Sequence, residues 1–139
     1  MSSIYIIVSS TDSVEYYPDN KASRFIVKLA KPLNLSGSWK VALCEISVFE
    51  NGVSVGIVGL NCNICNGLVT EGVQTQILRK FKCARNINEV FQNAYYMPVE
   101  KLFIDTLELY ITGSGGKPIT LSPKAKLVCT LHLLQDVSV

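Results

Sequence analysis

The sequence is poor in charged residues and in histidine, and it contains no long apolar run. Charged side chains make up 17% of its 139 residues, and 13 basic and 11 acidic residues give a formal net charge of +2. Because the basic residues are scattered, the sequence does not indicate a nucleic-acid binding surface. The apolar runs fall far short of the roughly 20 residues that cross a bilayer, so we expect no transmembrane segment.

The N-terminal segment lacks the features of a secretory signal. Met1 to Ser3 lead directly into the short apolar run 4–8, which has no basic flank. We therefore expect a soluble protein that is not secreted and is kept in a reducing compartment. The five cysteines are an odd number, which favours free thiols over a disulfide framework in such a chain.

The shortage of histidine also limits catalytic chemistry. His132 lies among leucines with no acidic residue near it in sequence, although the fold could still bring Cys44 or a serine close to it. A packed or hydrogen-bonded side chain is the better interpretation of His132. The acidic residues are dispersed, and no pair has the spacing of a glycosidase or metal centre. We expect no enzymatic activity, no cofactor and no small-molecule substrate.

Two short motifs are superficially typical of ligand sites. Cys62 and Cys65 have C-x-x-C spacing, but a second pair is missing, and residues three apart on an extended strand would face opposite sides. The run 113–117, Gly-Ser-Gly-Gly-Lys, lacks the spacing of a phosphate loop and precedes Pro118 rather than a helix. We predict no metal or redox role for the first motif and a hairpin connection for the second.

Alternation of apolar and polar residues with period two is the main positive signal. Hydrophobic residues make up 48% of the chain, and this period is typical of strands with one face on a core. Strands are predicted at 24–29, 39–43, 75–83, 102–111 and 126–134, the last being a central strand because both of its faces are largely apolar. Four glycines suggest bulges or close backbone approach in a stretch whose register stays open: Gly52, Gly56, Gly59 and Gly67.

One segment has helical spacing. Residues 86–94 are the best candidate for a short helix, because Asn86 can cap it and Ile87, Val90 and Phe91 share a face. Together with seven or eight short strands and no linker, this predicts an all-β sandwich or barrel that forms one domain over residues 1–139. The exposed edges of such a sandwich could pair with other chains.

Two aromatic clusters lie outside the alternating segments. Tyrosine, methionine and proline in loops are common in interfaces, but they also pack loops onto cores, so both interpretations stay open. The candidate partner-binding residues are Tyr16, Tyr17, Pro18, Asp19, Asn20, Tyr95, Tyr96 and Met97.

Segments from both halves of the chain resemble one viral family. They include the loop Tyr-Tyr-Pro-Asp-Asn at 16–20, the strand 25–29, the Pro-Leu-x-Leu-x-Gly-x-Trp pattern at 32–39, the Ala-Leu-Cys-Glu-Ile strand at 42–46, and the C-terminal strands 104–111 and 127–133. In these segments the sequence resembles the penton-like minor capsid proteins of Maverick/Polinton-type elements, adintoviruses and adomaviruses.

This resemblance implies a single jelly-roll β-sandwich of about eight antiparallel strands. It further implies a homopentamer at the fivefold vertices of an icosahedral virion, among double-jelly-roll major capsid proteins, made in the host cytoplasm or nucleus. The sequence departs from the family in lacking a long N-terminal arm, a large insertion and an Arg-Gly-Asp motif. An alternative function is a receptor- or glycan-binding β-sandwich module.

Overall fold

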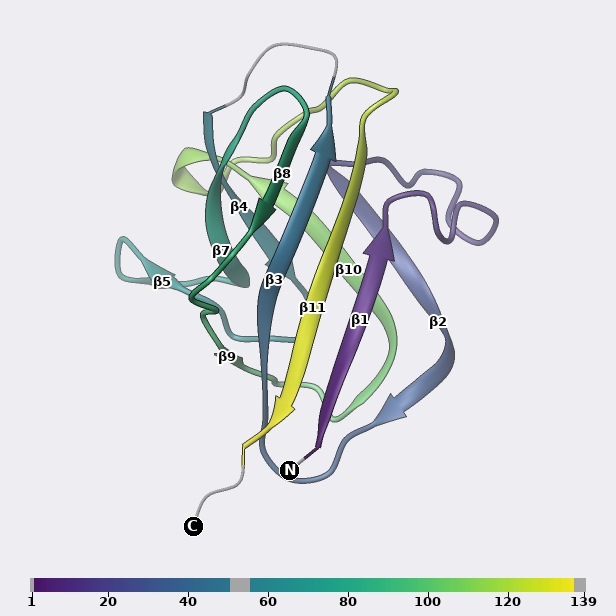
Figure 1. Cartoon of the computed structure of the whole chain (residues 1–139), viewed down its shortest axis with the longest axis vertical. Helices are drawn as coiled ribbons and strands as arrows, with labels where there is room; N and C mark the ends of the chain where they lie inside the picture. The colour runs from purple at the N-terminus through teal and green to yellow at the C-terminus, as the bar shows by residue number, and fades with distance from the viewer. Residues whose placement is uncertain (1, 51–55, 137–139) are drawn as a thin grey trace.

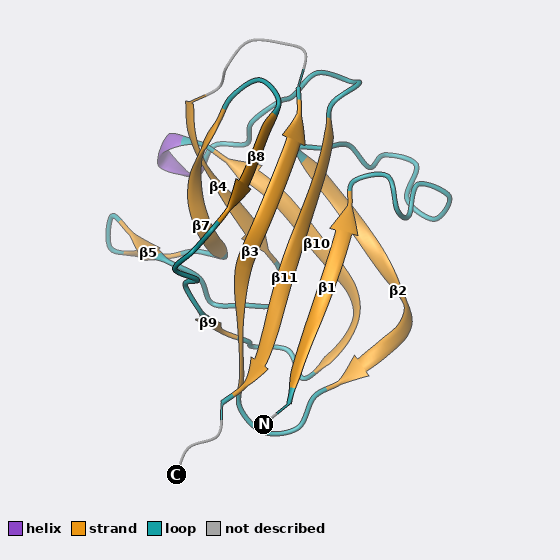
Figure 2. Cartoon of the chain, in the orientation of Figure 1, coloured by secondary structure: helices purple, strands orange, loops and turns teal. Residues whose placement is uncertain are grey.

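The computed structural model describes residues 2–50 and 56–136 and consists almost entirely of strands and loops (Figure 2). One helical turn, Ser114–Gly116, is the only helix among these residues, and none of their elements could cross a membrane as a helix. The strands are β1 (Ser3–Ser9), β2 (Arg24–Asn34), β3 (Trp39–Phe49), β4 (Gly56–Cys62), β5 (Val69–Thr70), β6 (Val73–Gln74), β7 (Ile77–Cys83), β8 (Ile87–Val90), β9 (Met97–Pro98), β10 (Phe103–Thr112) and β11 (Lys126–Gln135).

The strands form two antiparallel sheets that lie face to face (Figure 1). The front sheet has the order β1-β11-β3-β8, with β9 also pairing with β3, and the back sheet has the order β2-β10-β4-β7. Strands β5 and β6 form a separate hairpin. Because β1, β3, β8 and β11 lie in one sheet and β2, β4, β7 and β10 in the other, the chain repeatedly crosses between them. This connectivity is that of a single jelly roll, and the predicted fold class is confirmed.

The predicted alternation accounts for the central strands. In β11 the side chains of Leu127, Cys129, Leu131 and Leu133 are at most 1% exposed and face the core. Strand β11 lies between β1 and β3, as predicted for a strand with two largely apolar faces. In β2 the inward residues are Phe25 and Val27, while Arg24 and Lys28 face outward. The sequence therefore predicted the inward residues of both strands correctly.

A bulge in β3 changes which residues face inward. Thr130 of β11 pairs with Glu45, whereas the next residue, Leu131, pairs with Leu43, so Cys44 is the extra residue of β3. As a result Leu43 and Ile46 both face the core although they are three residues apart. Simple alternation would have assigned the residues after Leu43 to the wrong face of β3.

The predicted helix at 86–94 is wrong. Residues 87–90 form β8, which pairs with β3 and places Ile87 opposite Val48. Asn86 does not cap a helix; its φ of 51° places it in a left-handed turn between β7 and β8. Hydrogen bonding to the open edge of β3 stabilises a strand here, and this tertiary contact outweighs the weak helix propensity suggested by the spacing of three apolar residues.

Close backbone approach is confirmed at two of the four suspected glycines. A Cβ atom at Gly67 would collide with the backbone carbonyl of Ile77, and one at Gly59 would lie 3.0 Å from the Ile77 side chain. Gly56 has a φ of 84° and open space around it, so backbone conformation rather than contact favours glycine there. Gly52 lies outside the described residues.

Trp39 begins β3 and closes one end of the core. Its side chain is 8% exposed, and its Nε1 donates a hydrogen bond of 2.8 Å to the Ser36 carbonyl. We predict that Trp39→Ala lowers the free energy of unfolding by about 3–5 kcal/mol, because it leaves a cavity and removes one of the two hydrogen bonds that the Ser36 carbonyl accepts, the other coming from Gln135. Urea denaturation measures this difference. Phe103→Ala, which truncates an aromatic side chain that is 58% exposed, is the control and should cost far less. Equal losses in the two variants would contradict this assignment of the core.

Candidate functional site

The first predicted cluster forms the loop between β1 and β2. Asn20 ties this loop to β2, because its amide donates to the Ile26 carbonyl at 2.8 Å and accepts from the Ile26 amide at 2.9 Å. Tyr16 is 63% exposed, and the ammonium group of Lys28 lies 4.5 Å from its ring centre. Asn20 thus has a structural role, while Tyr16 remains available to a partner.

This loop borders a shallow hollow on the back sheet. The hollow has a volume of about 520 Å³ and extends from Tyr16 to Glu108 of β10. Arg24 forms an ion pair of 2.9 Å with Glu108, and its guanidinium lies 4.5 Å from the Tyr110 ring centre. The floor of the hollow is therefore held in place by contacts within the protein.

The second predicted cluster lies against the outer face of the front sheet. The hydroxyl of Tyr96 is 2.8 Å from Nδ1 of His132, and Lys40 Nζ lies 5.3 Å from the Tyr96 ring centre. Met97 of β9 pairs with Val41 of β3. Tyr95 is half exposed and lies under the guanidinium of Arg79, 3.9 Å from its ring centre. The loop 16–20 and the segment 95–97 lie at opposite sides of the sandwich (Figure 1).

His132 is a packed residue, as expected. Its ring stacks on Tyr5 at 4.2 Å between centroids and meets Tyr96 edge-on at 5.8 Å. Burial, with smaller contributions from Cys44 and Tyr5, raises the pKa of the Tyr96 hydroxyl. Nε2 of His132 is buried without a hydrogen-bond partner in the described part of the chain. No acidic side chain or thiol there forms a hydrogen bond with the ring, so the arrangement is not that of a general base.

Sequence analysis missed a set of exposed apolar side chains on the same face of the front sheet. Four large side chains point outward there and are 51–70% exposed: Tyr5, Ile7, Phe49 and Val90. Thr130 of β11 and Glu45 of β3 lie between Ile7 and Val90, so these apolar side chains share one face but are interrupted by polar ones. The available signal was the unbroken apolar run 4–8, which places apolar residues on both faces of β1. We call these four residues and Tyr96 the front face.

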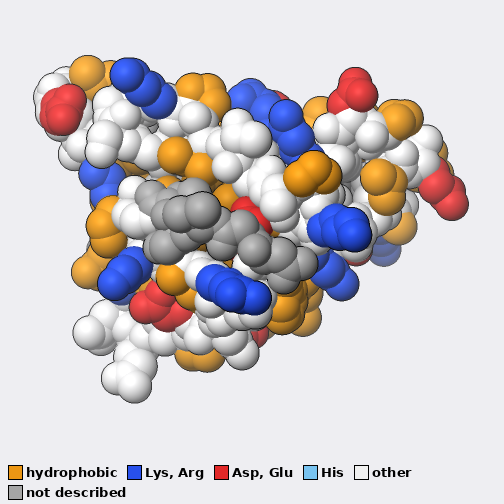
Figure 3. All heavy atoms as spheres, turned by 90° about the horizontal axis from the view of Figure 1, so that it is seen from above, with side chains coloured by type: hydrophobic (Ala, Val, Ile, Leu, Met, Phe, Trp, Pro, Cys, Tyr) orange, Lys and Arg blue, Asp and Glu red, His pale blue; other side chains and the backbone are white. Residues whose placement is uncertain are grey.

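Charge is mixed on the end of the molecule that Figure 3 shows. In the end view of Figure 3, lysine and arginine side chains are interspersed with neutral and apolar ones instead of forming one patch. This distribution does not favour binding to a phosphate backbone.

The Cys62–Cys65 motif forms a buried pair of thiols. The chain turns after Cys62, so the prediction of an extended strand with diverging sulfurs is wrong in its local geometry. Cys65 Sγ donates weak hydrogen bonds to the carbonyls of Cys62 and Gln76, at 3.6 and 3.7 Å. Burial raises the pKa of Cys62 to about 11 and also raises that of Cys65. Protonated thiols are poor ligands and nucleophiles, and residues 2–50 and 56–136 contain no cluster of three metal-ligating side chains.

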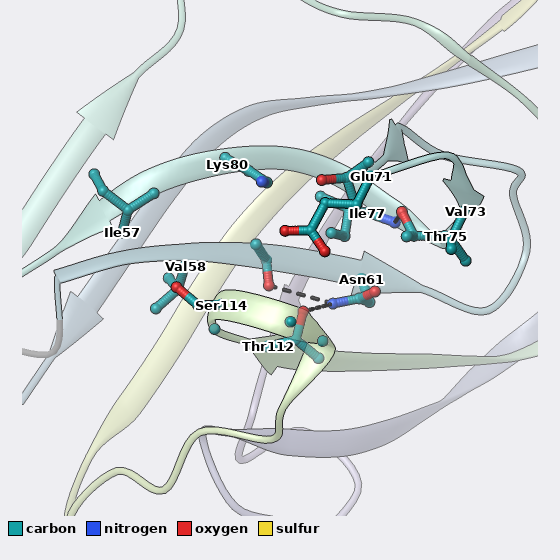
Figure 4. Close-up of a pocket in the computed structure, with 15 residues that line it drawn as sticks. Ile57, Val58, Asn61, Glu71, Val73, Thr75, Ile77, Lys80, Thr112 and Ser114 are labelled. Carbon is teal, nitrogen blue, oxygen red and sulfur yellow. Dashed lines mark hydrogen bonds between the residues drawn. The ribbon is translucent and has the colours of Figure 1, made fainter.

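The glycine-rich run makes a local turn at one end of the back sheet. Gly113 N donates to the Lys117 carbonyl at 2.8 Å. The strands that it connects, β10 and β11, lie in different sheets, so the predicted hairpin connection is instead a crossover. This turn, β4, β7 and the β5–β6 hairpin enclose a pocket of about 400 Å³ (Figure 4).

Comparison with known proteins agrees with the jelly-roll fold. No family model matches the sequence, and no curated protein matches it. The fold is similar to the crystal structure of the selenomethionine-labelled mavirus penton protein, with a TM-score of 0.64 and 6% sequence identity over 96% of this chain and 99% of that one. A structure of infectious bursal disease virus, strain Gx, aligns with 96% of this chain and 33% of its own at 12% identity, with a TM-score of 0.27.

Burial of the thiols predicts slow chemical modification. Cys44 is half-buried and the other four cysteines are buried, and burial raises the pKa of all five thiols. At pH 8 we expect a thiol reagent to modify one cysteine quickly in the native protein and all five after unfolding. Mass spectrometry identifies the labelled residue, and Cys44→Ser should abolish the fast phase. Fast labelling of Cys62 or Cys65 would instead reveal an accessible thiolate pair.

Proposed function

We propose that this chain is a penton-like capsid protein that forms a ring of five copies at the fivefold vertices of an icosahedral virion. The observation that carries the proposal is the likeness of fold to the mavirus penton protein over nearly the full length of both chains. The short segments that resemble penton-like proteins of Maverick/Polinton-type elements, adintoviruses and adomaviruses support the same function.

The front face supports self-association. Tyr5 and Ile7 are 66% and 70% exposed on neighbouring outward positions of β1, an edge strand. Burying them in water-excluding contact with a sister copy would stabilise a ring by about 25 cal/mol for each square ångström of apolar surface removed from water. In a homopentamer, a sister copy would cover the front face.

A closed ring requires two different surfaces on each copy, because its contacts are heterologous. The two predicted aromatic clusters could provide these surfaces, since they lie at opposite sides of the sandwich (Figure 1). We propose that Tyr95 and Met97, on either side of Tyr96, extend the front face, and that the loop 16–20 of the next copy docks against it. In this arrangement residues 1–139 act as one jelly-roll domain.

In the virion, the ring would contact other capsid proteins. We propose the major capsid protein as its second partner, and the virion, assembled after synthesis in the host cytoplasm or nucleus, as its location. The protein would then act through shape and contact rather than through chemical reaction.

Oligomeric state tests this function. Size-exclusion chromatography with light scattering should give about five times the 15.3 kDa of one chain, or a concentration-dependent approach to that mass. A dimer, a trimer, or a monomer at every concentration would contradict the vertex function.

A charged substitution tests the front face. Ile7→Asp would place an unpaired carboxylate in the ring contact, so we expect at least about tenfold weaker association, with an unchanged melting temperature at dilutions where both proteins are monomeric. Val69→Asp is the matched control, because Val69 is 65% exposed but lies in the β5–β6 hairpin. Tyr16→Ala should weaken association from the other side of the contact. If only Val69→Asp dissociates the ring, the interface lies at the hairpin and our assignment is wrong.

A further inference from the structure

The pocket beside the glycine-rich turn lies on the outer face of the back sheet, away from the front face (Figure 4). Its floor is formed by β4 and β10, one wall by β7 and the β5–β6 hairpin, and the other by the turn at Ser114–Gly116. At about 400 Å³ it falls within the size range of small-molecule sites. Assembly through the front face would leave it open.

The floor presents a buried polar pair with spare hydrogen-bonding capacity. Asn61 is only 3% exposed, and its Nδ2 donates to the Gly59 and Tyr110 carbonyls and, at 2.9 Å, to Thr112 Oγ1. The two N–H groups of Nδ2 are shared among these three acceptors, which fixes the orientation of the amide, and Oδ1 has no donor in the described residues. Thr112 Oγ1 accepts from Asn61, so its own proton is free to be donated. An acceptor and a donor thus lie side by side.

The rim adds two opposite charges. Glu71, at the tip of the hairpin, extends toward Asn61, and Lys80 projects from β7 (Figure 4). The two do not form an ion pair; in the described part of the chain the only ion pair is Arg24–Glu108. Both groups are therefore available to a ligand, and because their charges are opposite they favour neither an anion nor a cation.

Apolar side chains complete the walls. Ile57 and Val73 are each 61% exposed, and Ile77 covers the base of the wall beside Gly59. These groups provide contact for C–H surfaces but no aromatic face. A ligand that matches this pocket has hydroxyl groups that both donate and accept, no net charge, and an apolar side.

We propose that this pocket binds a neutral saccharide. One sugar hydroxyl can donate to Asn61 Oδ1 while it accepts from Thr112, and two adjacent hydroxyls can donate to the Glu71 carboxylate. The C–H face of the pyranose ring then lies against Ile77 and Val73. A capsid protein with this site would attach to glycans on a surface that the virion meets.

Titration of the isotope-labelled protein with neutral glycosides tests the site. The probes are the methyl glycosides of glucose, galactose, mannose and N-acetylglucosamine, followed by amide NMR shifts. We expect saturable shifts at residues 59–61, 71–73 and 113–116 with at least one probe. Glu71→Gln and Thr112→Val, which preserve shape, should each weaken binding about tenfold or more, because each removes a buried or charge-assisted hydrogen bond.

The controls separate this site from the capsid function. Glu89→Gln removes an exposed carboxylate on β8 and should leave the titration unchanged. The Ile7→Asp variant, diluted until it is monomeric, should bind the sugar as the original protein does, so failure of ring formation does not affect the result. No shift with any of the four probes, equal affinity in Glu71→Gln and Thr112→Val, or shifts produced only by sodium phosphate would each overturn the proposal.

Discussion

The structure depends on the contact between its two sheets. Every second side chain of the central strands points inward and forms this contact. Leu131 of β11, Leu43 of β3 and Leu107 of β10 are completely buried between the layers. Each contributes about 1.5–3 kcal/mol through removal from water. Because side chains alternate with period two, a slip of one residue would turn the inward set outward, so the core also determines the register of every pairing.

Because the core uses only the inward side chains, the outer faces of the two sheets can differ in composition. The outer face of the front sheet carries exposed aromatic and aliphatic residues around the Tyr5–His132 stack. The outer face of the back sheet carries the Arg24–Glu108 ion pair and a pocket over Asn61. In the proposed ring, the front sheet would contact sister copies and the back sheet would face the surroundings.

Sequence reasoning predicted the fold where alternation was uninterrupted. It placed the inward residues of β2 and β11 correctly and identified His132 as packed, because these depend on local period and composition. It failed where tertiary pairing decides the outcome: β8 resembled a helix over only three apolar residues, and the bulge at Cys44 leaves no mark in the sequence. The front face and the pocket combine residues from distant strands, so no single segment could reveal them.

The central claim is that five copies close into a ring through the front face. Single-particle electron microscopy of the purified protein tests it most directly. The account predicts rings of fivefold symmetry in which Tyr5 and Ile7 are buried against the adjacent copy. Rings of another symmetry, or fivefold rings in which these two side chains face solvent, would contradict it.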